Sequence, residues 1–155
     1  MFQNQNFVEY SELGLNYLKD ISKIIKRNSG GLLLIDYGYT NKKMKDTLQA
    51  VSNHKFANIL NNIGSVDITH NISFNLFKNF VEKIGGLTSN LTTQKKFLIK
   101  MGIKQRAEII SKKQNFLKKT DIYYRLNRLI DEKQMGTLFK VMLIKDKKNK
   151  FKFGF

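Results

Sequence analysis

One short apolar run limits the folds open to this chain more than any other feature. Leu32 to Ile35 are four aliphatic residues in a row, with Gly30 and Gly31 before them and Asp36 and Gly38 after them. A run of this length between turn residues predicts a strand buried on both faces, the type found in parallel sheets covered by helices. Such a strand is not stable alone, so we expect an α/β fold with other strands beside it.

Amphipathic periodicity predicts helices around this strand. Ser11 is the predicted N-cap of a helix that runs to Arg27, with apolar residues every three or four positions. Further helical segments are expected at residues 74–84 with Ser73 or Asn71 as the cap, at 94–99 after Thr93, at 104–118 and at 121–130. Asp131 and Gln134 then have the spacing of a capping box.

The rest of the chain is expected to be extended or irregular. Residues 39–72 contain polar residues and no sustained period, which predicts a long excursion without regular structure. A short extended segment is expected near residues 87–91, a second strand at 138–144, and a weak hairpin that ends at 151–153. Residues 1–155 are therefore predicted to form one unit, without a separate second domain.

Composition excludes disulfide-bonded folds, thiolate metal sites and membrane-spanning helices. The chain has no Cys, and no apolar run approaches the roughly 20 residues of a membrane-spanning helix. The net charge of +16 has two interpretations: compositional drift in an AT-rich genome, or a basic module that binds RNA or an acidic membrane surface. Lysines are spread along the whole chain, so we expect no specific nucleic-acid partner, and only residues 145–152 are dense in them.

Six short sequence motifs, which we call words, are spaced along the chain. They are residues 8–11 (VEYS), 30–39 (GGLLLIDYGY), 46–51 (DTLQAV) with His54, 67–70 (DITH) running into Phe74, 93–94 (TQ) with 97–98 and 102–103, and 135–141 (MGTLFKV). Each word is weak alone. Together they resemble the MidA-like class I S-adenosylmethionine-dependent methyltransferases over nearly the whole chain.

This resemblance implies a fold and an activity. The chain is similar to the C-terminal part of a Rossmann-like methyltransferase sheet with covering helices, and the N-terminal half that holds the cofactor is missing. S-adenosylmethionine is therefore expected in the complete enzyme and not on this chain alone. The family implies methyl transfer to a protein arginine, linked to the assembly of respiratory complex I. The implied location is the bacterial cytoplasm, or the mitochondrial matrix for an organellar protein.

The same resemblance bears on partners. A separate N-terminal polypeptide would make the chain half of a split enzyme, with a complex I subunit as its protein substrate. A remnant of a broken gene would be inactive. Two apolar strands are too few for a covered sheet, so the chain alone is expected to be poorly stable, aggregated or a homodimer.

Three candidate residues for a substrate or cofactor cleft follow the apolar run. Asp36, Tyr37 and Gly38 lie where the predicted strand meets its loop, and open α/β sheets bind ligands beyond the carboxyl ends of their strands. A structural alternative is that Asp36 caps a turn and Gly38 supplies a positive φ angle. No residue is assigned a catalytic role.

Six further cleft candidates are polar residues of the matching words: Asp46, Gln49, Asp67, Thr69, His70 and Gln94. The triplet at 67, 69 and 70 groups a carboxylate, a hydroxyl and an imidazole ahead of a helix, although it is equally typical of a helix entry. The amides and Asp46 could orient a substrate nitrogen, or could be ordinary loop residues. The only other histidine is His54, so no metal site is expected.

Two residues depart from the family pattern. Lys95 follows Gln94 where the family usually has Gly, and Ser73 precedes Phe74 where the family usually has Asp or Asn. Both changes fall inside the region that resembles the family, so the local site geometry there is the feature to check.

Overall fold

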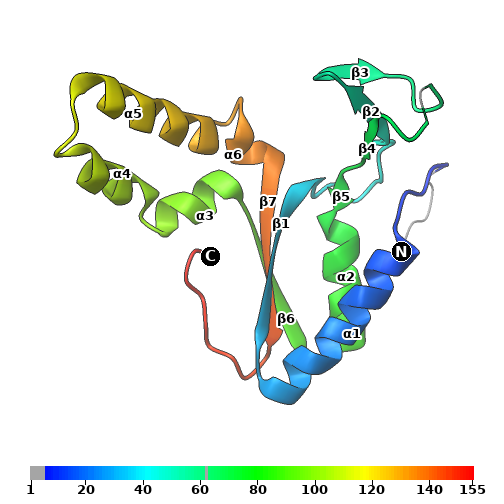
Figure 1. Cartoon of the computed structure of the whole chain (residues 1–155). Coiled ribbons are helices and arrows are strands. Elements are labelled where there is room, and N and C mark those ends of the chain that lie inside the picture. The colour runs from blue at the N-terminus through cyan, green and yellow to red at the C-terminus, as the bar shows by residue number, and fades with distance from the viewer. Residues whose placement is uncertain (1–5, 62) are drawn as a thin grey trace.

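The structure is a computed structural model, and it describes residues 6–61 and 63–155 as a mixed α/β fold. Figure 1 shows a central sheet with α1 and α2 on one side and the helices α3 to α6 on the other. A small second sheet lies beyond one end of the central sheet. The predicted α/β class is confirmed.

The central sheet has the strand order β5-β1-β7-β6. Its middle is formed by β1 (Gly31–Tyr39) and β7 (Phe139–Asp146), which are antiparallel, and β6 (Leu87–Thr93) is antiparallel to β7. The short β5 (Ile72–Ser73) is parallel to β1 and pairs only with Gly38 and Tyr39. The strands β1 and β6 therefore run in the same direction, and their carboxyl ends lie at the same end of the sheet.

The core lies between the sheet and the helices α1 (Glu12–Asn28) and α2 (Phe74–Ile84). Ser11 begins α1 as predicted, because its side chain accepts a hydrogen bond of 3.0 Å from the Gly14 N–H. Ser73 caps α2 in the same way. Removing the apolar side chains of this core from water is the main stabilising contribution. Its buried members are Leu18, Ile25, Phe74, Val81, Leu87, Met142 and Ile144.

The other side carries α3 (Gln94–Lys100), α4 (Ile103–Ser111), α5 (Phe116–Ile130) and α6 (Met135–Leu138). Thr93 caps α3 as predicted. The single helix predicted at 104–118 is wrong, because the chain leaves α4 after Ser111 and starts again at α5. Asn115 causes the restart, since its side chain accepts a hydrogen bond of 3.0 Å from the Lys118 N–H.

The excursion predicted at 39–72 is also wrong, because it contains a three-stranded antiparallel sheet of order β3-β2-β4. Its strands are β2 (Gln49–Ser52), β3 (Lys55–Ala57) and β4 (Asp67–Thr69). The hairpin between β2 and β3 turns through Asn53 and His54, whose φ angles are 49° and 62°. Such a turn usually contains Gly, and the sequence offers none there, so the hairpin has no obvious sequence signature.

The prediction that the apolar run is buried on both faces is wrong. Side chains of β1 alternate, and Leu33 and Ile35 are each 46% exposed on the face opposite the core. Among the described residues, no strand pairs with Gly31 to Tyr37 on the side away from β7. We call the exposed side chains of Leu33, Ile35 and Tyr37 the open face of β1.

The C-terminal segment covers part of this face without forming a strand. The hairpin predicted to end at 151–153 is wrong, since those residues are not in the sheet. Instead the Nζ of the buried Lys145 donates to the carbonyls of Asn149 and Phe151, at 2.6 and 2.7 Å. An apolar hollow of about 490 Å³ remains between this segment, α3 and the sheet.

Candidate functional site

The carboxyl end of β1 contains three of the predicted site residues. Asp36 and Tyr37 lie within the strand, which continues to Tyr39, and the Asp36 carboxylate accepts a hydrogen bond of 2.7 Å from the N–H of Tyr37. The Tyr37 ring packs on Phe139 of β7, with 4.1 Å between the ring centroids. This end of β1 therefore presents one carboxylate and one half-exposed phenol.

Gly38 does not supply the positive φ angle that the structural alternative predicted. Its φ angle is not positive, so the backbone conformation does not require glycine. A Cβ atom there would lie 2.4 Å from the Ile72 carbonyl oxygen and 2.6 Å from the Phe74 ring. Glycine at this position lets the segment that enters α2 approach β1 closely.

The second group of predicted residues gathers on the small sheet. Gln49 and Thr69 face each other across β2 and β4, and the Gln49 Nε2 donates a hydrogen bond of 3.1 Å to the Thr69 hydroxyl. Asp67 and His70 lie at the two ends of β4 and are exposed, as is Asp46 ahead of β2. The alternative of a helix entry at 67–70 is wrong, because Ser73 is the cap of α2.

Sequence reasoning missed the residue that ties these segments together. The Thr47 hydroxyl donates to the Glu9 carboxylate at 2.6 Å and accepts from the Asn71 N–H at 2.9 Å. Three stretches far apart in sequence thus meet at one side chain. Glu9 and Thr47 both lie in the words that carry the family resemblance, which was the available signal.

Gln94 lies apart from both groups. It is buried at the start of α3, and its Nε2 donates to the Leu129 carbonyl at 2.9 Å and to the Met135 carbonyl at 3.4 Å. These bonds connect α3 to the end of α5 and to α6. The geometry gives Gln94 a scaffolding contact, and neither bond leads toward the open face of β1.

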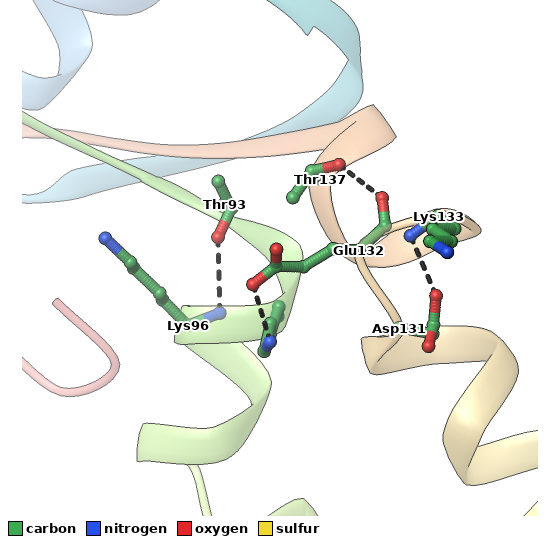
Figure 2. A network of polar contacts seen from close by, with 7 residues as sticks. Thr93, Lys96, Asp131, Glu132, Lys133 and Thr137 are labelled. Atoms are coloured by element: carbon green, nitrogen blue, oxygen red, sulfur yellow. Dashed lines mark hydrogen bonds and ion pairs between the residues drawn. The ribbon is translucent and has the colours of Figure 1, made fainter.

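Around the start of α3, a polar network joins the helices (Figure 2). The Lys95 Nζ lies 2.7 Å from the Glu132 carboxylate, and the Thr137 hydroxyl donates to the Glu132 carbonyl at 2.7 Å. Asp131 does not form the predicted capping box with Gln134; its carboxylate accepts from the Lys133 N–H at 2.7 Å. The departure from Gly at position 95 therefore adds an ion pair between α3 and the loop before α6.

Lys140 is a titratable group beside Asp36 in the central sheet. It is the register partner of Asp36 on one side and of Thr93 on the other, so the three residues form a row across the sheet. Burial lowers the pKa of Lys140, and its Nζ donates to the Thr137 carbonyl. This row of a carboxylate, an amine and a hydroxyl can hydrogen-bond a polar substrate at the strand ends.

Comparison with known proteins decides the family. Residues 1–93, more than half of the chain, match the family described as "Putative S-adenosyl-L-methionine-dependent methyltransferase". The chain belongs to this methyltransferase family. The resemblance drawn from the six words is confirmed, and the matched residues include every site candidate except Gln94.

The curated relatives that the chain matches are longer proteins. Protein arginine methyltransferase NDUFAF7, mitochondrial, of Xenopus tropicalis is 27% identical over 124 residues, which are 79% of this chain and 28% of the frog protein. The protein of the same name from Danio rerio is 26% identical over 132 residues, 83% of this chain and 30% of the fish protein. The chain thus spans less than a third of the length of these methyltransferases.

Two solved structures share the fold of this chain. An uncharacterised protein from Burkholderia thailandensis matches with a TM-score of 0.76 and 22% identity, over 94% of this chain and 40% of its own. A member of the same superfamily from that organism, bound to S-adenosyl-homocysteine, matches with a TM-score of 0.75 and 22% identity, over 94% of this chain and 39% of its own. The predicted Rossmann-like methyltransferase fold is confirmed.

The described residues do not fit S-adenosylmethionine by themselves. A nucleotide-type glycine loop follows a strand and opens a helix. Here the pair Gly30 and Gly31 leads from α1 into β1, and the pair Gly85 and Gly86 leads from α2 into β6, which is the reverse order. No group of three or more His, Asp or Glu that could hold a metal ion occurs within residues 6–61 and 63–155.

No helix within the described ranges combines the length and the apolar character needed to cross a bilayer.

Proposed function

We propose that this chain is the C-terminal part of a protein arginine methyltransferase, whose N-terminal half holds the cofactor. The observation that carries the proposal is the unpaired side of β1, in a chain whose fold matches 40% of a solved relative. S-adenosylmethionine, held by the N-terminal half, supplies the methyl group. The proposed acceptor is an arginine on a respiratory complex I subunit, in keeping with the relatives that are arginine methyltransferases.

The first support is the backbone of β1. Among residues 6–61 and 63–155, the stretch from Gly31 to Tyr37 pairs with β7 only, on one side. Unpaired N–H and C=O groups along a strand are a template for another strand. A strand from the N-terminal half, added on the free side, would pair these groups and extend the sheet.

The second support is the open face. Leu33, Ile35 and Tyr37 are each more than 40% exposed although they belong to the longest strand of the central sheet. Apolar surface of this kind favours association, since each Å² removed from water contributes about 25 cal/mol. Helices of the N-terminal half would cover this face, and with it the apolar hollow that includes Leu33.

In the completed enzyme, we assign substrate positioning to the carboxyl end of β1. One Asp36 oxygen accepts the Tyr37 N–H, and a carboxylate has further lone pairs with which to accept from a guanidinium. The hydrogen bond at Thr47 and the one between Gln49 and Thr69 hold the neighbouring segment, residues 47–71, in place. Methyl transfer needs mainly an oriented acceptor nitrogen, so these residues act by positioning it.

Co-expression with the N-terminal half of the Burkholderia thailandensis relative tests this function. We expect a stable complex that transfers a radiolabelled methyl group from S-adenosylmethionine to an arginine of a recombinant complex I subunit, whereas the chain alone transfers none. Asp36→Asn should lower this activity at least tenfold, and Asp20→Asn, an exposed aspartate on α1, should leave it unchanged. Failure to form a complex, or equal activity of both variants, would contradict the proposal.

A further inference from the structure

We call the helices α3 to α6 the helical lobe. The loop between α4 and α5 is the part of this lobe that lies farthest from the central sheet (Figure 1). Directly after this loop come the first two residues of α5, Phe116 and Leu117, which are 79% and 77% exposed. Two large apolar side chains side by side at a protruding tip do not contribute to the core. Their exposure needs an explanation outside the fold of the chain.

The charge around this tip is all of one sign. Lys112 and Lys113 precede the two apolar residues, Lys118 and Lys119 follow them, and all four are exposed. Residues 109–120 contain no acidic residue. Across both helices, residues 103–130 hold eight Lys and Arg against two acidic residues, one of which is paired with Arg125.

We propose that this lysine-flanked tip, residues 112–119, docks on the surface of an anionic phospholipid membrane. Phe116 and Leu117 would enter the boundary between headgroups and acyl chains, while the lysines stay among the headgroup phosphates. Each lysine near such a surface strengthens binding about fivefold. Burial of each apolar side chain adds about tenfold or more.

Charge complementarity and the paired apolar residues favour a membrane over RNA. Single-stranded RNA is bound by aromatic side chains spaced along a groove, with arginine contributing. This tip has one aromatic residue and no arginine within residues 112–119. An aliphatic Leu beside Phe gains from acyl chains and not from bases.

Vesicle co-sedimentation of the full chain tests the proposal. We expect binding to vesicles with 30% phosphatidylglycerol, none to pure phosphatidylcholine, and loss of binding as salt rises. Phe116→Ser with Leu117→Ser should weaken binding at least thirtyfold, and changing the four lysines to Gln at least a hundredfold. Two controls should bind as the unsubstituted chain does: Phe56→Ser, at an 80% exposed Phe of the small sheet, and the exposed pair Lys42→Gln with Lys43→Gln.

A fluorescence measurement separates insertion from charge attraction. The chain contains no Trp, so Phe116→Trp introduces a single reporter at the tip and Phe56→Trp a matched one elsewhere. We expect a blue shift on anionic vesicles for position 116 only. Equal shifts at both positions, equal binding by the double-serine variant, or binding to single-stranded RNA that excludes vesicle binding would overturn the proposal.

Discussion

Tyr37 and Phe139 are register partners on β1 and β7, and their rings lie 4.1 Å apart at an inclination of 35°. The pair ends the row of apolar side chains that runs along the open face from Leu33 through Ile35. Phe139 is partly buried while Tyr37 is 44% exposed, so one side of this aromatic pair is left to solvent. The open face is therefore an ordered surface, held by cross-strand packing and available to a partner.

Self-association of the chain should depend on this face. Ile35→Thr keeps the β-branched shape but removes apolar surface, so we expect fewer dimers or aggregates in light scattering after size exclusion and an unchanged unfolding midpoint. Leu34→Thr, one residue away on the core face, should instead lower the free energy of unfolding by about 2 kcal/mol. If Ile35→Thr leaves self-association unchanged, the open face is not the surface responsible.

Gly38 should tolerate no larger side chain. We expect Gly38→Ala to lower the free energy of unfolding by about 2 kcal/mol or more in urea titrations, because the new methyl group meets the Ile72 carbonyl and the Phe74 ring. Gly31→Ala is the matched control on the same strand, since its Cβ would meet only ordinary contacts from 3.4 Å outward. Similar stability of the two variants would show that the close approach at Gly38 is absent.

The buried amide of Gln94 should stabilise the helical lobe. Gln94→Ala removes the donor to the Leu129 and Met135 carbonyls, and we expect a cost of about 1–3 kcal/mol in the free energy of unfolding. Gln134→Ala removes an exposed amide with no capping bond and should change stability by less than about 0.5 kcal/mol. A Gln94→Ala variant as stable as this control would contradict the scaffolding contact.

The ion pair between Lys95 and Glu132 should respond to pH. The hydrogen bond from Lys95, and then its charge, lower the pKa of Glu132 below the usual value of 4.5. A carboxyl with a lowered pKa stabilises the fold above its unfolded pKa, and this contribution is lost as the pH falls through the lowered value. A double-mutant cycle with Lys95→Ala and Glu132→Gln should therefore give favourable coupling at pH 7, weaker coupling in high salt, and none in acid.

Much of the fold could be predicted because local signals agreed with the tertiary packing. Ser11, Ser73 and Thr93 are strong N-caps ahead of amphipathic stretches, and each begins a helix where expected. The hairpin at Asn53 and His54 could not be predicted, because non-glycine residues adopt positive φ angles there. The helix break at Asn115 was hidden by good helix formers on both sides.

The assignment of the candidate residues to a cleft remains a prediction. The resemblance drew attention to the segments that carry them, but it did not reveal which atoms are in contact. The hydroxyl of Thr47 bridges Glu9 and Asn71, residues 38 and 24 positions away, and no local pattern reports such a contact. The strand was expected to be covered on both faces because an apolar run alone does not reveal which neighbours the chain supplies.

Isothermal titration with S-adenosylmethionine tests the central claim most directly. The claim is that this chain forms the C-terminal part of a methyltransferase sheet, and that the cofactor site lies in the N-terminal half. The chain alone should show no saturable binding tighter than about 100 μM, which corresponds to roughly 5.5 kcal/mol, and the complex with an N-terminal half should bind. Saturable binding by the chain alone below that concentration would contradict the account.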